Sequence, residues 1–278
     1  MYSAVVDENG DIIQTTQFTN ETNNKYFESD ITFSSDLKTV YFTWNNFYNT
    51  QKRIDSAKWK TLRIVKATYN DKFELIDTEP LPINSAEYSV RCPELSKDGK
   101  QLYFASDMPG GFGGYDLYVV DILQDGSYSK ARNLGSNVNS KKDEMYPFIT
   151  LNNELYFSST GHNGQGRFDV FLSEMKRGKF EKAINLPAPV NSAYDDFAFV
   201  INSHHNAGFF SSTREGGIGD VDIYAFKKNL YPEICKKTVT GEVFNAKTEL
   251  RISNVRVNLF KGDELVDSQM VAFGNKFQ

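Results

Sequence analysis

The sequence is poor in the residues that build disulfide frameworks and metal sites. It has only two cysteines, Cys92 and Cys235, and three histidines among 278 residues. Two cysteines are too few for a disulfide framework, and these two lack the spacing of zinc ligands. The His204-His205 pair falls in a predicted hairpin turn, which favours a solvated turn over a metal pair. We therefore expect no metal ion and no cofactor.

Other features are absent as well. There is no run of about 18 apolar residues, so the sequence predicts no transmembrane segment. Residues 1–11 show no basic region followed by an apolar core, which a signal peptide would have. The net charge of −5 argues against nucleic acid as a partner, because nucleic-acid-binding domains usually carry a basic surface. No 3.6-residue hydrophobic periodicity extends over the length of a helix, so long helices are not expected.

What the sequence does have is strand-forming residues arranged in a repeat. Aromatic residues make up 14% of the chain, with 22 Phe and 15 Tyr, and aromatic residues favour strands. The stretch YFASDMPGGFGGYDLY at 103–118 recurs as YFSSTGHNGQGRFDVF at 156–171 and as FFSSTREGGIGDVDIY at 209–224. The same spacing of 53 residues separates the repeated serines and the repeated aspartates, which are Ser106, Ser159, Ser212, Asp116, Asp169 and Asp222.

Each unit is interpreted as four short strands joined by turns. In the unit that begins near residue 89, Asp98-Gly99 provides the positive-φ chemistry of a hairpin between the first and second strands. Hairpins repeated at such a period are typical of the blades of a β-propeller. The glycines of 110–114 lie between two predicted strands and not before a helix, so they indicate a turn and not a phosphate-binding loop.

The predicted fold is all-β, with a β-propeller of about five blades, incomplete in this chain, followed by a partial β-sandwich. Residues 1–228 are assigned to the propeller, 229–237 to a linker, and 238–278 to the start of the second domain. Residues 1–18 align with the third and fourth strands of a unit, and 197–228 lack a fourth strand. We therefore expect the sequence to be a segment of a longer polypeptide.

The repeat and the tail each resemble a known family. The unit P-x-L-S-x-D-G-x-x-L-Y-F-x-S followed by G-G-x-G-x-x-D-L-Y, strongest at 93–118, resembles the TolB-like, WD40-like propeller repeat of bacterial envelope proteins. The tail, TGEVFNAKT and then NVRVNLF, resembles the start of a carboxypeptidase-regulatory-like domain. This order is similar to that of OmpA-family envelope proteins of Bacteroidota, which include PorE of the type IX secretion system.

The resemblance carries expectations about place and partners. It implies a periplasmic, outer-membrane-associated location, with other envelope proteins as partners. It implies peptidoglycan binding only through a further domain that these 278 residues do not contain.

The acidic residues of the repeat have a structural and a functional interpretation. The repeated aspartates open the third strand of each unit, where they are expected to accept hydrogen bonds from the glycine loop. A cation site is the alternative, although such a site needs more oxygen ligands than these loops carry. The pairs Asp143-Glu144 and Asp195-Asp196 have the chemistry of glycosidase carboxylates. Their equivalence within the repeat favours a structural role, because catalysis needs two carboxyls in unlike environments.

The first unit departs from the repeat, with Leu37 in place of the turn glycine and an insert at 44–60, WNNFYNTQKRIDSAKWK, in place of the glycine loop. The insert holds both tryptophans of the chain, and aromatic residues with arginine carry much of the energy at protein interfaces. A long loop that folds back on its own blade is an equally supported alternative. The candidate partner-binding residues are Trp44, Phe47, Tyr48, Arg53 and Trp59.

The function predicted from the sequence is a non-enzymatic protein-interaction or scaffolding propeller of the cell envelope. The alternative is a carbohydrate-active propeller, either a glycoside hydrolase or a lectin.

Overall fold

The computed structural model describes residues 2–7, 12–17, 28–45, 61–69, 75–228, 241–252 and 254–272. Within these ranges the regular elements are all strands, and no described residue is helical. The chain divides into two compact units, Met1–Lys228 and Asn229–Gln278.

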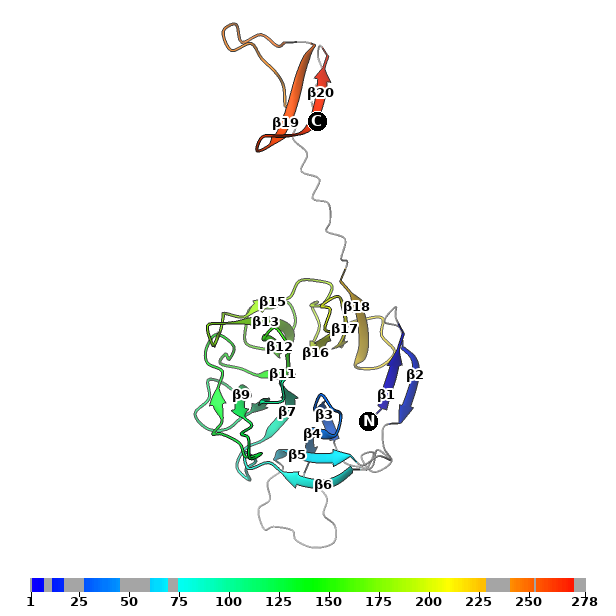
Figure 1. Ribbon diagram of the computed structural model, residues 1–278, viewed down its shortest axis with the longest axis vertical. Helices are drawn as coiled ribbons and strands as arrows, with labels where there is room; N and C mark the ends of the chain where they lie inside the picture. The colour runs from blue at the N-terminus through cyan, green and yellow to red at the C-terminus, as the bar shows by residue number, and fades with distance from the viewer. Residues whose placement is uncertain are drawn as a thin grey trace. The chain divides into compact units, whose positions relative to one another are not determined.

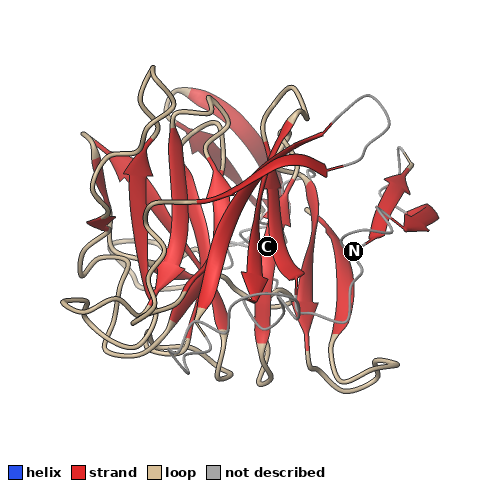
Figure 2. Ribbon diagram, turned by 90° about the horizontal axis from the view of Figure 1, so that it is seen from below, coloured by secondary structure: helices blue, strands red, loops and turns tan. Residues whose placement is uncertain are grey.

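The first unit is built from antiparallel sheets placed around a common axis (Figure 1). Their strands are joined by loops at the two ends of the sheets (Figure 2). Three sheets have four or more strands: β3 Glu28–Phe33, β4 Thr39–Asn45, β5 Leu62–Tyr69 and β6 Leu75–Pro80; β7 Val90–Leu95, β8 Gln101–Ser106, β9 Asp116–Asp121 and β10 Arg132–Asn133; β11 Glu144–Ile149, β12 Glu154–Ser159, β13 Asp169–Lys176, β14 Lys179–Phe180 and β15 Ile184–Asn185.

Two smaller sheets complete the described part of this unit. One has three strands, β16 Asp196–Ile201, β17 Ala207–Ser212 and β18 Asp222–Lys227, and the other is the hairpin of β1 Tyr2–Val6 and β2 Ile12–Gln17. The predicted all-β propeller fold is therefore confirmed.

Neighbouring sheets are held together by separate hydrophobic cores. Successive residues of a strand point to opposite faces of its sheet, and the repeated aromatic pair of the second strand uses both faces. Phe104 of β8 packs with Tyr41 and other residues of the β3–β6 sheet. Tyr103, the residue before it, packs with Leu155 and Phe157 of the β11–β15 sheet. One Tyr-Phe dipeptide thus contributes to two cores, which explains why such pairs recur.

The first strand of four sheets contains the same irregularity. One residue in each has a positive φ, and the register shifts there, as expected for a β-bulge. The four residues are Asp30 (φ 55°), Cys92 (φ 53°), Tyr146 (φ 53°) and Ala198 (φ 52°). These strands lie innermost in their sheets, so the bulges recur around the axis of the propeller.

The second unit contains one described hairpin, β19 Val255–Lys261 paired with β20 Glu264–Val271. An isolated bridge joins Phe244 to Arg251, and the Arg251 guanidinium lies 2.8 Å from Glu242.

Candidate interaction surfaces

The repeated aspartates bind the backbone of the glycine loops. Asp116 is fully buried, and its carboxylate accepts hydrogen bonds from the backbone N–H of Phe112 (2.5 Å) and Gly113 (3.2 Å) and from the side-chain amide of Asn133 (2.7 Å). These contacts are of the kind expected for a residue that organises the loop.

The same arrangement recurs in the next two sheets. Asp169 accepts hydrogen bonds from the N–H groups of Gln165 (2.9 Å) and Gly166 (3.0 Å), and Asp222 accepts one from Gly219 (3.2 Å). Among the described residues, no group of three or more His, Cys, Asp and Glu side chains is placed to hold a metal ion.

We predict that Asp116→Ala lowers the free energy of unfolding by about 1–3 kcal/mol, because it leaves the loop N–H groups of Phe112 and Gly113 and the Asn133 amide without their buried acceptor. The exposed Asp220, in a loop, supplies the control Asp220→Ala, for which little change is expected. Urea denaturation of both variants makes the comparison. A melting temperature that rises with calcium in the wild type and not in Asp116→Ala would contradict the structural role and support a cation site.

The repeated serines fix the end of each second strand. The Ser106 hydroxyl donates to the backbone carbonyl of Ser89 (2.7 Å), and the Ser159 hydroxyl donates to the Glu144 carboxylate (2.6 Å). Ser212 accepts a hydrogen bond from the guanidinium of Arg214 (2.9 Å). All three serines are buried, and each contact fastens the second strand where its loop begins.

The acidic pairs make repeated structural contacts. Asp143 accepts a hydrogen bond from the N–H of Tyr115, and Asp195 accepts one from the N–H of Phe168, both at 3.0 Å. The first member of each pair therefore fastens the loop that precedes the third strand of the previous sheet.

The second members of the pairs are fully buried. Glu144 accepts hydrogen bonds from the hydroxyls of Ser140 and Ser159, both at 2.6 Å, and burial raises the pKa of its carboxyl above the usual value. Asp196 lies 2.5 Å from the Arg214 guanidinium. The contacts given for the two carboxyls thus belong to two separate buried networks.

Sequence reasoning missed a set of asparagines that hold the third strands. The Asn139 side-chain oxygen accepts a hydrogen bond from the N–H of Leu117 (2.8 Å), and its amide nitrogen donates to the carbonyl of the same residue (2.9 Å). Asn191 makes both contacts with Val170 (2.8 Å each), and Asn84 makes both with Ile64 (2.9 and 2.8 Å). An Asn-Ser dipeptide at all three positions was the signal in the sequence.

The bulges of the inner strands surround a cavity of about 120 Å³ near the axis. Cys92 donates a hydrogen bond from its thiol to Asp30 (3.3 Å), and Arg91 lies 3.7 Å from the same carboxylate. Burial, together with the negative charge of Asp30, raises the pKa of the Cys92 thiol. The thiol is therefore protonated at neutral pH and is a poor nucleophile. The lining residues are Asp30, Cys92, Glu94, Tyr146, Phe148 and Ala198, with their neighbours on the same strands.

Of the five candidate partner-binding residues, only Trp44 lies within the described residues. Phe47, Tyr48, Arg53 and Trp59 lie outside them. Trp44 is the penultimate residue of β4, and 40% of its surface is exposed. It borders a shallow pocket of about 150 Å³ whose other lining residues are Arg63, Val65, Thr78 and Pro80.

No helix among the described residues is long and apolar enough to cross a membrane.

Comparison with known proteins returns propellers of similar fold at low sequence identity. No family model matches the chain, and no curated protein is similar to it in sequence. The similar solved structures include a putative TolB from Agrobacterium tumefaciens (TM-score 0.47, 14% identity, 71% of this chain and 60% of that one). They also include TolB from Acinetobacter baumannii (TM-score 0.46, 13% identity, 82% of this chain and 46% of that one). The chain thus spans less than two thirds of the length of either protein.

The same comparison corrects one prediction from the sequence. Prolyl oligopeptidase B from Galerina marginata is also similar (TM-score 0.45, 13% identity), and so is a puromycin hydrolase (TM-score 0.43, 13% identity). The chain matches 26% of the length of each. The prediction that the chain is not an enzyme is therefore wrong, because propellers of this fold also occur in hydrolases. At such identities the likeness concerns the fold alone.

Proposed function

We propose that the chain is a protein-interaction propeller of the bacterial cell envelope. We further propose that a partner protein docks on the face around Trp44, the first residue of the insert at 44–60. The exposure of Trp44 is the observation that carries the proposal. Trp44 occupies the repeat position of Ser106, Ser159 and Ser212, where the serines are at most 1% exposed. A large aromatic side chain, 40% exposed, thus replaces a small buried one in a single sheet. Tryptophan is enriched among the residues that carry binding energy at protein interfaces.

The surroundings of Trp44 support binding at this place. The pocket beside it is lined by Arg63 together with the apolar residues Val65 and Pro80. The insert that follows Trp44 in sequence adds Phe47, Tyr48, Arg53 and Trp59, which completes a set of aromatic and arginine residues suited to an interface. Function of this kind commonly lies on loops that a rigid scaffold positions.

The proposed location and partner class rest on the repeat and the tail of the sequence. Both resemble OmpA-family envelope proteins, so we place the chain in the periplasm, associated with the outer membrane. The order of the domains favours the branch of that family that includes PorE of the type IX secretion system. Peptidoglycan binding is assigned to a further domain and to no residue of this chain.

The interaction is tested with tagged protein purified from envelope fractions, followed by quantitative mass spectrometry. The protein that co-purifies most strongly is then expressed, and its affinity is measured directly. We expect Trp44→Ala, or replacement of residues 46–58 by a short Gly-Ser turn, to weaken that affinity by about 30-fold, the equivalent of about 2 kcal/mol at a buried aromatic anchor.

The matched control is Phe112→Ala. Phe112 is also an exposed aromatic residue (51%), and it lies in the corresponding loop of the β7–β10 sheet. If Trp44→Ala and the replacement of residues 46–58 both leave the protein folded and the affinity unchanged, docking at this face is refuted. Recovery of the chain from the cytoplasm of fractionated cells would refute the envelope location.

A further inference from the structure

The loop that joins β12 to β13 contains the dipeptide Asn163-Gly164. Asparagine is a chemically labile residue. It reacts most readily when glycine follows it, because glycine has no side chain to hinder attack of its own backbone nitrogen on the asparagine side chain. The sequence has one other Asn-Gly dipeptide, Asn9-Gly10, which lies outside the described residues.

The reaction is a ring closure followed by hydrolysis. The backbone nitrogen of the glycine loses its proton and attacks the Cγ atom of the asparagine. A C–N bond forms, the side-chain amide nitrogen leaves as ammonia, and a five-membered succinimide ring remains. Water then adds to one of the two ring carbonyls and breaks its bond to nitrogen, which gives aspartate or isoaspartate. Ammonia is lost and water is gained, so the balance needs no enzyme, cofactor or oxidant.

The surroundings of Asn163-Gly164 leave this reaction unhindered. Both residues are exposed. Among the described residues, neither the Asn163 side chain nor the Gly164 N–H has a hydrogen-bond partner. The attacking nitrogen and the departing amide are therefore not held by the described structure.

The Asn-Ser dipeptides of the repeat are held at both groups. The Asn139 side chain binds the third strand, as described above, and the N–H of the following Ser140 donates to the buried Glu144 carboxylate (2.8 Å). In the next sheet, the N–H of Ser192 donates to Asp196 (2.6 Å) in the same way. Burial and hydrogen bonding should therefore protect these asparagines.

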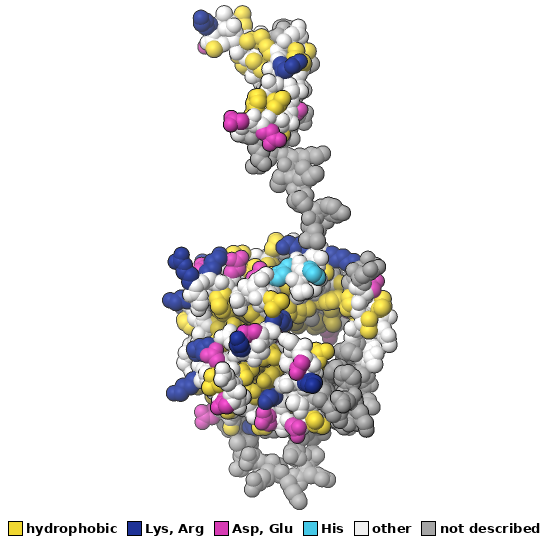
Figure 3. Space-filling view, in the orientation of Figure 1, with side chains coloured by type: hydrophobic (Ala, Val, Ile, Leu, Met, Phe, Trp, Pro, Cys, Tyr) yellow, Lys and Arg dark blue, Asp and Glu magenta, His cyan; other side chains and the backbone are white. Residues whose placement is uncertain are grey.

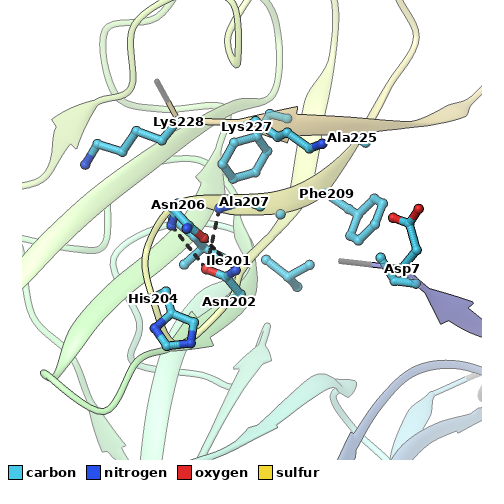
Figure 4. Close-up of a pocket in the computed structure, with 14 residues that line it drawn as sticks. Asp7, Ile201, Asn202, His204, Asn206, Ala207, Phe209, Ala225, Lys227 and Lys228 are labelled. Carbon is cyan, nitrogen blue, oxygen red and sulfur yellow. Dashed lines mark hydrogen bonds between the residues drawn. The ribbon is translucent and has the colours of Figure 1, made fainter. Parts of the chain in front are cut away.

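Exposure alone does not distinguish Asn163. The turn at 202–206 carries the exposed His204, and histidine side chains show at the surface in the space-filling view (Figure 3). In this turn the Asn202 amide donates to the Asn206 side-chain oxygen (2.7 Å), and the Asn202 oxygen accepts a hydrogen bond from the N–H of Asn206 (3.1 Å) (Figure 4). The N–H of Ala207, the nitrogen that would attack Asn206, also donates to the Asn202 oxygen (3.4 Å). These asparagines lie at the surface and are nevertheless held.

The two Asp-Gly dipeptides, which can close the same ring, are held at the glycine nitrogen. In both, the glycine N–H donates to the backbone carbonyl three residues earlier, from Gly99 to Ser96 (2.8 Å) and from Gly126 to Leu123 (2.9 Å). Gly164 makes no such bond within the described structure.

The fold requires glycine at position 164. A Cβ atom there would lie 1.9 Å from Oδ2 of Asp169, the buried aspartate that organises the loop. In the other two copies of the loop, the residue before the equivalent glycine is itself glycine, at positions 110 and 216. Asparagine stands there only in this copy, so only here does the requirement for glycine create an Asn-Gly pair.

We propose that Asn163-Gly164 is a site of spontaneous modification, which converts Asn163 to isoaspartate or aspartate and releases the loop from Asp169. Isoaspartate adds a methylene group to the main chain directly before Gly164, and both products add a negative charge to the loop. The N–H groups of Gln165 and Gly166, which donate to Asp169 (2.9 and 3.0 Å), move with the lengthened chain.

The effect extends to the next sheet, because the loop is attached to it. The N–H of Phe168 donates to Asp195 (3.0 Å). Gly166 packs so closely on the backbone of Tyr194 that a Cβ atom at 166 would lie 1.8 Å from the Tyr194 carbonyl oxygen. Release of the loop therefore loosens the contact with residues 192–196.

The test incubates the full 278-residue chain at mildly alkaline pH, where more of the glycine nitrogen is deprotonated, and follows each asparagine by digestion and mass spectrometry. We expect the peptide that contains residue 163 to gain about 1 Da and to separate into two products. Asn139 and Asn202 in the same digest should react at least tenfold more slowly. In urea, the rate at Asn163 should stay within about threefold of the rate in the folded chain, because the fold leaves the pair unprotected.

Asn163→Gln supplies the matched control, because glutamine keeps the amide but is one methylene longer and closes its ring far more slowly. Both chains keep Asn9-Gly10, so a difference between them belongs to position 163. After equal incubation, hydrogen exchange at residues 164–168 should be faster in the wild type than in the variant. The melting temperature of the wild type should also be lower by about 2–4 °C.

Two results would overturn the proposal. The first is a rate at Asn163 that is no greater than the rate at Asn202, or that rises more than tenfold in urea, since either would show that the fold protects the pair. The second is unchanged exchange protection at residues 164–168 in wild-type chains that carry isoaspartate, which would show that the loop keeps its contacts with Asp169.

Discussion

Replacement of Asn139 by alanine is expected to lower the free energy of unfolding by about 2–4 kcal/mol. Asn139 is 2% exposed, and its amide makes both backbone contacts with Leu117 described above as well as a 2.8 Å hydrogen bond to the Asn133 oxygen. Alanine leaves the buried Leu117 N–H without an acceptor, and an unsatisfied buried group costs about 1–3 kcal/mol. The lost side-chain volume and the freed Asn133 oxygen add to that value.

Urea denaturation measures the effect, with Asn152→Ala as the matched control. Asn152 is an exposed residue of the turn between β11 and β12, so its replacement should change stability by no more than about 0.5 kcal/mol. A loss below about 1 kcal/mol for Asn139→Ala would mean that the third strand is held by its sheet pairing alone.

The fold was predictable because its signals are local and repeated. Asp98-Gly99 marks a hairpin by backbone chemistry, and Gly99 has the positive φ (71°) that such a turn needs. The 53-residue spacing of Ser106, Ser159 and Ser212 then places the hairpins in successive blades. Neither inference depends on knowing which residues meet in space.

The bulges of the inner strands left no such signal. Asp30, Cys92, Tyr146 and Ala198 share one backbone conformation and share no chemical property. None of them is glycine, the residue that usually marks a positive φ. Their conformation is imposed by the pairing of first and second strands, so it follows from the sheets and not from the residue type. The cavity that these residues line could not be predicted from the sequence for the same reason.

The candidate sites were predictable only in part. The aspartates of the repeat could be singled out from the sequence, because one residue type recurs at one position. The asparagines at 84, 139 and 191 were overlooked, although they recur equally, because they stand in loops whose spacing varies slightly from unit to unit. The exclusion of enzymatic activity failed for a different reason, since a propeller fold is shared by proteins with and without catalysis and the fold alone does not separate them.

The last prediction compares two residues at one repeat position. Leu117→Ala should lower the free energy of unfolding by about 3 kcal/mol, because Leu117 is fully buried and its truncation leaves a cavity in the core between two sheets. Ile223→Ala removes an equally large side chain that is 71% exposed, so a change within about 0.5 kcal/mol is expected. Urea denaturation of both variants gives the contrast directly.

The contrast tests whether the face of the β16–β18 sheet that carries Ile223 is open in solution. Leu117 and Ile223 are matched in repeat position and in side-chain size. A difference between the two losses of stability therefore measures whether another sheet covers the side chain. Equal losses of stability at the two positions would show that Ile223 is covered in solution. The inference that this face is open would then be wrong. A large loss at Leu117 with little change at Ile223 would leave an apolar strand face exposed in the folded protein, and such a face favours association with another polypeptide.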